Sequence, residues 1–194
     1  QGDFVDIPWG SDVATKFVTN VGLITSNGPH GPNIMAAEWT FHLSYKQGLV
    51  AVAIGAGKAP AENIEPTKQF GVNLAATDQS VMTSISGGYS GRDTDKIAAL
   101  KELGFSFDSA QKIKAPMVKD AALNIECKLV MTIPLGDHTL FVGEALTTST
   151  SDKEPLAYHT GKYWKLTIPV EKPSTDERER IKTVVERHRR RTVS

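Results

Sequence analysis

One stretch of the sequence combines the residue types of an anion-binding site. Gly55-Ala56-Gly57-Lys58 follows an apolar run, and Pro60 stands where a helix would begin. The free amides of a glycine-rich turn and of a helix N-terminus attract an anion, and a lysine adds positive charge. The pattern predicts a phosphate-binding turn. An ordinary strand-to-helix connection explains the local sequence equally well.

His138 is the best single candidate for a titratable group in a site, because it begins a predicted strand directly after Gly136-Asp137. A lone histidine at a turn is more often simply solvated. The histidines as a group show no metal-ligand spacing, so the sequence predicts no metal; they are His30, His42, His138, His159 and His188. Cys127 falls on an apolar face, which predicts a buried, inert thiol rather than a nucleophile.

The stretch from Gly31 to Gly57 predicts two extended segments joined by a turn at 46–48. The second, Leu49 to Ile54, is apolar on both faces, which is typical of a strand inside a sheet or barrel wall. Small residues next to Trp39 let a flat ligand approach the backbone. A tight strand-to-strand contact would need the same small residues, and periodicity alone favours that interpretation.

Composition excludes several classes of function. The chain has 194 residues, enough for one domain with appendages. Its 22 basic and 22 acidic residues cancel, so no overall field favours nucleic acid or an anionic membrane. No apolar segment is long enough to cross a bilayer, and the first residues lack a signal-peptide pattern. A single cysteine excludes an intrachain disulfide, so we expect a cytoplasmic protein.

The remaining segments predict mostly strands. Period-two alternation between 123 and 133 places Leu123, Ile125, Cys127, Leu129, Met131 and Ile133 on one face. Further strands are expected at 17–25, 70–75, 138–147 and 156–168, with helices at 60–70, at 77–85 and, capped by Asp93 or Thr94, at 95–103. The expected fold class is α+β, mainly β: a closed or nearly closed antiparallel barrel with a few peripheral helices.

The C-terminal segment differs from the rest. Ser174 and Glu177 have the spacing of a capping box, and basic residues gather at the end of the predicted helix (Arg187, Arg189, Arg190 and Arg191). A solvated helix end or a contact with a partner chain explains this charge better than phosphate or nucleic-acid binding, since the whole chain is neutral. We therefore expect a barrel domain at 1–170 and a helical extension at 171–194.

Motifs in the same order along residues 14–164 resemble the flavin reductase-like family of FMN-binding split β-barrels, which includes flavoredoxin and ferric reductases. The similar segments are 33–39 (N-x-M-x-x-x-W), 49–54, Lys58, 62–64 (ENI), 70–74 (F-x-V-N-L), 90–96 (S-G-x-D-x-D-K), 115–116, 123–127 (L-x-x-E-C), 136–144 (G-D-H-x-L-F-V-G-E) and 156–163. The predicted C-terminal helix lies outside them.

The resemblance implies FMN bound noncovalently at a homodimer interface, in a split barrel of Greek-key type. The flavin ring would lie along 33–39, the phosphate near 55–58, and the redox edge near His138 and the loop 89–96. The implied cofactor-binding residues are Asn33, Met35, Ala36, Ala37, Glu38, Trp39, Thr40, Ile54, Gly55, Ala56, Gly57, Lys58, Asn63, Tyr89, Ser90 and Lys96. His138 would hydrogen-bond the reacting edge and stabilise the anionic reduced flavin.

Two positions depart from the family pattern. Glu38 stands where serine is common, and Pro60 stands near a common threonine. If Glu38 faces the phosphate, it places an anion beside an anion.

The leading hypothesis is an NAD(P)H-dependent flavin reductase that passes electrons to free flavin, ferric chelates or a partner oxygenase. An FMN-dependent electron-transfer protein that does not use NAD(P)H is the alternative, followed by a non-catalytic FMN-binding protein.

Overall fold

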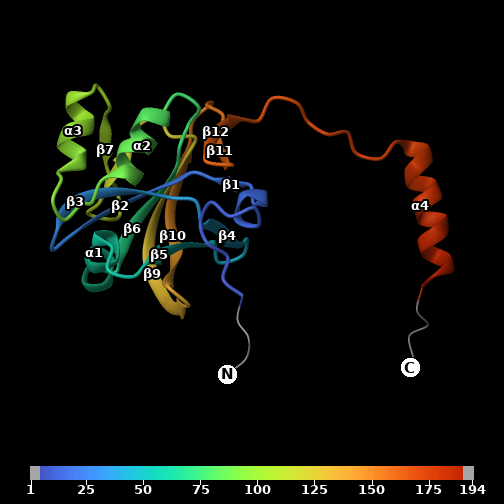
Figure 1. Ribbon diagram of the computed structural model, residues 1–194, viewed down its shortest axis with the longest axis horizontal. Helices are drawn as coiled ribbons and strands as arrows, with labels where there is room; N and C mark the ends of the chain where they lie inside the picture. The colour runs from blue at the N-terminus through green and yellow to red at the C-terminus, as the bar shows by residue number, and fades with distance from the viewer. Residues whose placement is uncertain (1–4, 190–194) are drawn as a thin grey trace.

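The computed structural model describes residues 5–189 (Figure 1). Its main element is a seven-stranded antiparallel sheet with the order β3-β2-β6-β9-β10-β5-β4. These strands are β2 Gly22–Gly28, β3 Gly31–Ala37, β4 Thr40–Ser44, β5 Leu49–Gly55, β6 Gln69–Leu74, β9 Leu123–Leu135 and β10 His138–Thr150. The sheet curves around one apolar core, which confirms the mainly β, split-barrel fold.

The barrel interior is filled by alternate residues of the strands. Val50, Val52 and Ile54 face inward from β5, and Phe70 and Phe141 pack against them. Such packing requires a close approach at one point. A Cβ on Gly143 would lie 2.6 Å from the Phe70 ring, so glycine there makes room for the largest core side chain. β5 lies between β10 and β4, so the prediction of an interior strand is confirmed.

A second layer covers the outer side of β2 and β3. Helices α2 (Ser80–Gly88) and α3 (Lys96–Glu102) bury Met82, Ile97 and Leu100 against Leu23 and Ile34. Two small sheets complete the molecule: β1 (Thr19–Asn20) with β11 (Leu156–His159) and β12 (Lys162–Lys165), and β7 (Phe107–Ser109) with β8 (Pro116–Val118). The short strands β7 and β8 were not expected, because three residues carry too little periodicity. A 3-10 turn, η1 (Ala14–Lys16), precedes β1.

Several predicted strand boundaries were wrong. The expected strand at 17–25 is two strands in different sheets, β1 and β2. The expected segment at 156–168 is a hairpin, because Thr160 and Gly161 adopt positive φ and turn the chain. The core face of 123–133 ends at Leu129. A bulge between Val142 and Gly143 of β10 shifts the register there, and Met131 and Ile133 are exposed.

Helix boundaries also differ from the predictions. α1 spans Ala59–Thr67 and ends three residues earlier than expected, because Pro66 lacks an amide hydrogen and Lys68 takes a left-handed conformation. α2 starts later than predicted, since the Thr77 amide bonds to Glu154 and Thr77 does not cap the helix. The cap of α3 is Asp95, which accepts from the Ala98 amide, rather than Asp93 or Thr94.

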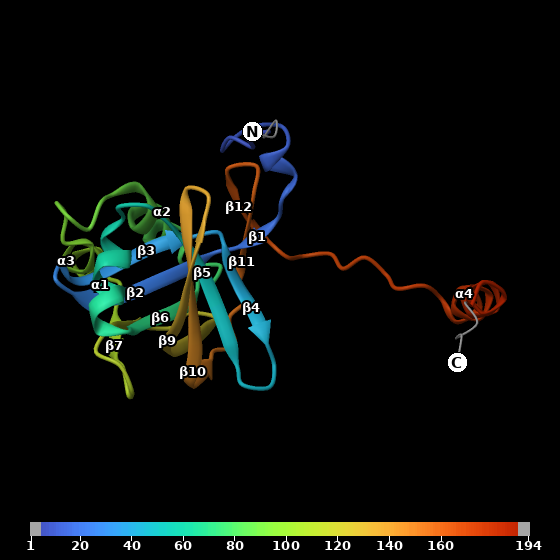
Figure 2. The ribbon, with the colours of Figure 1, turned by 90° about the horizontal axis from the view of Figure 1, so that it is seen from below.

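The C-terminal helix α4 (Thr175–Arg187) lies away from the barrel in both views, at the end of an extended segment (Figure 2). It buries none of its residues, and its predicted capping box between Ser174 and Glu177 is present. Arg190 and Arg191 of the predicted basic end lie outside the described residues, as do residues 1–4. Between residues 5 and 189, every helix is too short or too polar to span a membrane.

Candidate functional site

Three distant segments meet at one end of the barrel wall. The first residue of β10, His138, pairs with Gly55, the last residue of β5. The ring of Trp39, at the corner between β3 and β4, lies 4.6 Å from the His138 ring, and its backbone carbonyl accepts from the Ala53 amide at 2.9 Å. Trp39 is 40% exposed. The fold therefore brings together an imidazole, an indole and a glycine backbone. That the redox edge lies near His138 and the loop 89–96 stays a prediction.

The turn before β10 orients His138. Its Nδ1 lies 2.7 Å from the Asp137 carboxylate, and this hydrogen bond lowers the pKa of Asp137. The Asp137 carbonyl accepts from the Ala56 amide, which ties this turn to the glycine-rich turn (3.2 Å). A carboxylate on one ring nitrogen leaves the other, Nε2, free for a ligand. A Cβ on Gly55 would lie 3.6 Å from Nε2, so this nitrogen faces the glycine turn.

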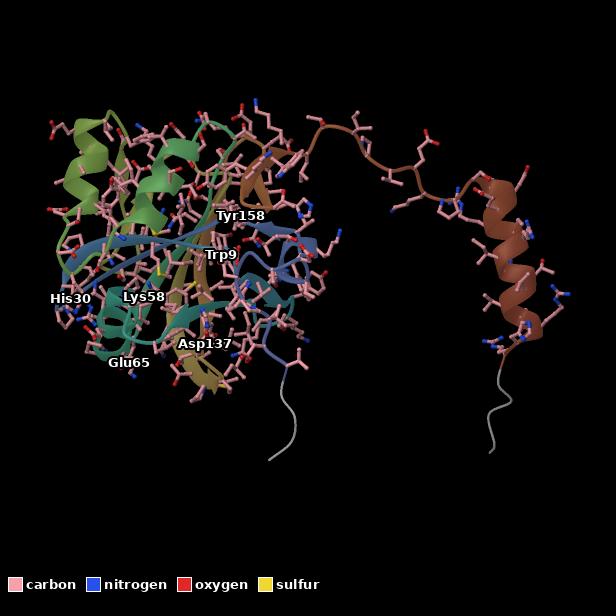
Figure 3. All side chains as sticks on the ribbon, viewed as in Figure 1. Trp9, His30, Lys58, Glu65, Asp137 and Tyr158 are labelled. Atoms are coloured by element: carbon pink, nitrogen blue, oxygen red, sulfur yellow. The ribbon has the colours of Figure 1, made fainter. Side chains whose placement is uncertain are left out.

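The glycine turn has the geometry of a strand-to-helix connection with an exposed lysine. Gly57 has a φ of +72°, and Lys58 is the extended N-cap residue of α1. The Ala56 amide is already bonded to Asp137, and the Lys58 amide lies 3.4 Å from the Gly55 carbonyl. Figure 3 labels Lys58 at the start of α1 and Asp137 on the β9–β10 turn. The Lys58 side chain and the N-terminal end of α1 are the features left for an anion.

The strand β3 presents one polar group that the chain itself does not satisfy. Asn33 is 2% exposed, and its Nδ2 has no hydrogen-bond partner among the described residues. Met35 packs on the barrel core and Ala36 on the opposite layer, where it contacts α2. Ala37 and Ile54 are buried. A buried amide without a partner is uncommon and is typical of a binding site.

Glu38 and Thr40 lie on the other side of the corner. Burial raises the pKa of Glu38, and its charge, after burial, raises the pKa of the Tyr158 hydroxyl. Glu38 is therefore near enough to the β11–β12 hairpin for its charge to act on Tyr158. The Thr40 hydroxyl donates to the Ala37 carbonyl and packs where a Cβ on Gly22 would stand. Thr40 thus braces the corner with a hydroxyl that is already bonded.

Asn63 lies in α1 and holds the β2–β3 turn. Its Nδ2 donates to Ser26 Oγ and to the Gly31 carbonyl, while its Oδ1 accepts from the His30 amide. The side chain is fully buried. With its polar atoms bonded in this way, Asn63 supports the turn next to β3.

The loop between α2 and α3 carries the remaining predicted residues. Tyr89 and Ser90 are exposed, and Ser90 Oγ accepts from the Arg92 amide at 3.2 Å. Lys96 is 2% exposed, and its Nζ donates to the carbonyls of Ser86 and Tyr89 at 3.1 and 3.0 Å. Burial, followed by the charge of Lys58, lowers the pKa of Lys96 to about 8. Lys58 and Lys96 thus act on the same region.

An ionic cluster next to the glycine turn was missed from the sequence. Arg92 Nη2 donates to the Gly57 carbonyl at 2.8 Å and to Glu62, whose other oxygen pairs with His30. The bonds to His30 and Arg92 lower the pKa of Glu62. Arg92 occupies the variable position of the S-G-x-D motif, and His30 appeared isolated. A search for opposite charges within the similar segments would have found Arg92 and Glu62.

Two further predictions concern the Cys127 thiol and a metal site. Cys127 is fully buried, and burial together with the neighbouring Glu126 raises the pKa of its thiol to about 12, so the predicted inert thiol is confirmed. Between residues 5 and 189, His, Cys, Asp and Glu side chains nowhere gather in the groups of three that could hold a metal ion.

Known proteins share both the sequence pattern and the fold. The sequence profile of the flavin reductase like domain matches residues 14–167. An uncharacterised protein of Pyrococcus abyssi is 31% identical over 140 residues, which cover 72% of this chain and 77% of that protein. An NADH-dependent FMN reductase of Streptomyces nodosus subsp. asukaensis is 27% identical over 78% of this chain and 80% of its own length.

Solved structures agree. The flavin reductase PheA2 superposes with a TM-score of 0.69 at 29% identity, over 81% of this chain and 95% of that one. Flavoredoxin of Methanosarcina acetivorans superposes with a TM-score of 0.71 over 90% of this chain and 96% of its own; at 21% identity it supports the fold alone. The family profile spans the whole barrel and every segment of the site. The chain therefore belongs to the flavin reductase-like family.

Proposed function

We propose that this protein is a flavin reductase that holds FMN noncovalently, accepts hydride from NAD(P)H and passes electrons to a small acceptor or a partner oxygenase. One observation carries the proposal: the rings of Trp39 and His138 lie in tilted contact, with an angle of 53° between their planes, beside Gly55, where the glycine turn begins. The matched relatives from Streptomyces and Rhodococcus are named as NADH-dependent, which favours NADH as the donor.

The residues present fit a flavin. Asn33 offers a buried donor without a partner, which a carbonyl or ring nitrogen of the flavin edge would satisfy. Lys58, at the N-cap of α1, offers a cation for a phosphate, and the dipole of the helix adds to its attraction. Glu38, at the position of the family serine, is partly buried, and its charge acts on the Tyr158 hydroxyl of β11. When bound, flavin supplies the hydride-accepting ring.

His138 and Trp39 would form the reacting end of this site. The Trp39 ring, half exposed and tilted against the imidazole, offers a flat surface to a ring. His138 Nε2 faces the glycine turn and could hydrogen-bond a ligand there, while Asp137 fixes Nδ1. Such a hydrogen bond would stabilise negative charge at the reacting edge without transferring a proton.

We further propose a homodimer. Residues paired across antiparallel strands share a face. Phe41 lies in one row with Ala51, Val142 and Met131, and the two following rows add Ile133 and Leu135, which pairs directly with His138. Phe41, Met131, Ile133 and Leu135 are 36% to 55% exposed. Because this apolar strip leads to His138, a second copy that covered it would also close the site. Sedimentation that found monomers alone would contradict the homodimer.

We propose that residues 171–194 form an extension outside the barrel unit at 1–170. The family profile ends at 167, and α4 contributes no contact to the site. Its arginines need no role in catalysis.

The experiment is an absorbance spectrum of the purified protein, before and after adding NADH or NADPH without oxygen. We expect a flavin band, or one that appears after adding FMN, and rapid bleaching by the pyridine nucleotide. A flavin band that persists with both nucleotides but is bleached by a reduced protein partner would instead establish the electron-transfer alternative. A protein that refuses FMN would overturn the proposal.

A further inference from the structure

Hydrogen bonds hold the loop between α2 and α3 on two sides. On the inner side, the buried Lys96 bonds to the carbonyls of Ser86 and Tyr89. On the outer side, Arg92 reaches across to the glycine turn, where its Nη2 and Nε lie 2.8 and 3.3 Å from the Gly57 carbonyl. Residues 89–92 are therefore held against the turn proposed to receive the phosphate.

The outer contact is part of a charged chain that joins three segments. Arg92 from the loop bonds to Glu62 of α1, and Glu62 bonds to His30 in the turn between β2 and β3. A single exposed ion pair contributes little because water competes for both charges. Arg92 combines such a pair with a charge-assisted bond to a carbonyl, and this combination fixes one loop position more firmly than either contact alone.

The loop held in this way covers the unsatisfied amide of Asn33. A Cβ built on Gly91 would lie 2.4 Å from Asn33 Oδ1 and 2.5 Å from Nδ2. The backbone of Gly91 thus packs directly on the Asn33 side chain, whose Nδ2 has no partner among the described residues. A ligand atom needs the space next to Nδ2 to accept its hydrogen bond, so the loop has to move before Asn33 can bind a ligand.

We propose that Arg92 is a positioning residue of the flavin site: through Gly57 and Glu62 it holds Gly91 over Asn33, and flavin enters only when this contact opens. The inference rests on the proposed function, since it takes flavin as the ligand of Asn33. Arg92 could act as a latch or as a phosphate ligand, and these two roles have opposite consequences. A latch favours the closed, empty site, whereas a phosphate ligand favours the filled one.

The latch makes an unusual prediction for Arg92→Ala. If only the open form binds, the observed association rate is the intrinsic rate multiplied by the open fraction. Loss of the latch raises that fraction, so FMN should bind about fivefold to tenfold faster and correspondingly more tightly. Loss of a positive charge beside an anion site would by itself slow the binding of a phosphate. A faster rate therefore opposes the electrostatic trend.

The test is stopped-flow quenching of flavin fluorescence, with FMN and with uncharged riboflavin as probes. Gly91→Ala provides a charge-neutral counterpart, because its Cβ would push the loop away from Asn33. Both variants should accelerate association of both probes and leave dissociation unchanged; Arg92→Lys, which keeps one contact, should fall between them and the wild type. Two variants are the matched controls. In Gly88→Ala the added Cβ has no atom within 4 Å, and Lys153→Ala breaks a separate exposed ion pair with Asp78.

The outcomes separate this inference from the proposed function. Unchanged association rates in Arg92→Ala and Gly91→Ala would overturn the latch while leaving a flavin site. Weaker FMN binding and faster FMN release in Arg92→Ala, with riboflavin unaffected, would show that Arg92 is a phosphate ligand and would also overturn the latch. A wild-type protein that binds neither probe would overturn the proposed function and the latch together.

Discussion

Two buried asparagines show how differently this barrel uses the same side chain. Asn73 on β6 is fully buried; its Nδ2 donates to the Leu23 carbonyl and Thr25 Oγ1, and its Oδ1 accepts from the Val118 amide and from Asn124. Asn33 on β3 is just as buried, yet its Nδ2 has no partner among the described residues. A satisfied amide stabilises the fold, and an unsatisfied one is available to a ligand.

The same contrast separates two buried charged residues. Glu126 on β9 accepts from the amides of Gln111, Lys112 and Ile113, so this carboxylate organises the loop before β8. Lys96 has two carbonyl partners, but burial and then the charge of Lys58 lower its pKa. Glu126 thus serves the fold alone, whereas the charge of Lys96 is held in a setting that disfavours it until an anion binds nearby.

Paired substitutions should show the largest effect. Asn73→Ala strands the Val118 amide and the Leu23 carbonyl in the core, so we expect it to lower the free energy of unfolding by about 3 kcal/mol. Asn33→Ala removes a group whose donor is already unsatisfied, so it should cost less than about 1 kcal/mol while weakening FMN binding about tenfold. Urea unfolding and FMN titration measure the two quantities. Equal losses of stability would remove the basis of the comparison.

His138→Ala should have the next largest effect, and only on chemistry. Its imidazole is partly exposed and bonds to an exposed carboxylate, so folding loses little. The loss of its hydrogen bond at the reacting edge should slow flavin reduction by NAD(P)H about tenfold to hundredfold, measured in a single turnover without oxygen. His188→Ala, at the C-cap of the distant helix α4, is the control. An unchanged single-turnover rate in His138→Ala would place this residue outside the reacting site.

The lowered pKa of Lys96 predicts a smaller, pH-dependent effect. Its positive charge is lost as the pH rises through about 8, so its attraction for a phosphate fades there. Between pH 7 and 9.5 we expect FMN binding to weaken about threefold to fivefold, and riboflavin binding to remain nearly constant. Lys96→Met should abolish the difference between the two slopes. A slope that persisted in this variant would assign the titration to another group.

Lys96 should affect folding with the opposite sign. Because its pKa is lower in the folded than in the unfolded chain, the unfolded chain binds more protons between about pH 8 and its ordinary value of 10.5. The Lys96 contribution to the free energy of unfolding therefore increases with pH across this window, and it is lost as the pH falls through about 8. Urea titrations of the wild type and Lys96→Met at pH 7 and 10 would reveal this difference.

Much of the barrel followed from sequence patterns. A continuous apolar run predicted β5, alternating residues predicted β9 with β10 as its return strand, and the capping-box spacing predicted the start of α4. These patterns reflect short-range physics: strand pleating and the unsatisfied amides of a helix. The ordered motifs also pointed to Trp39, Gly55 and His138, which the structure brings together.

The same motifs did not reveal what each polar residue does. Asn73 and Glu126 lie in motif segments as regular as the one that contains Asn33. Their side chains, however, are hydrogen-bonded to backbone amides of the same chain. The Arg92–Glu62–His30 chain joins pairs of residues that are 30 and 32 positions apart, so no pattern within a single segment marks their meeting. Short strands such as β7 and β8 escaped prediction because their pairing depends on distant partners.

By itself, the sequence determined the mainly β architecture, the family pattern and the residue types available for a flavin site, because periodicity and motif order are written along the chain. Only the tertiary structure decided that Asn63 and Thr40 brace turns, and that Gly91 covers Asn33. The physical reason is that satisfaction of a buried polar group depends on what surrounds it in space. A partner may come from any part of the chain, and its presence or absence separates a structural asparagine from a binding one.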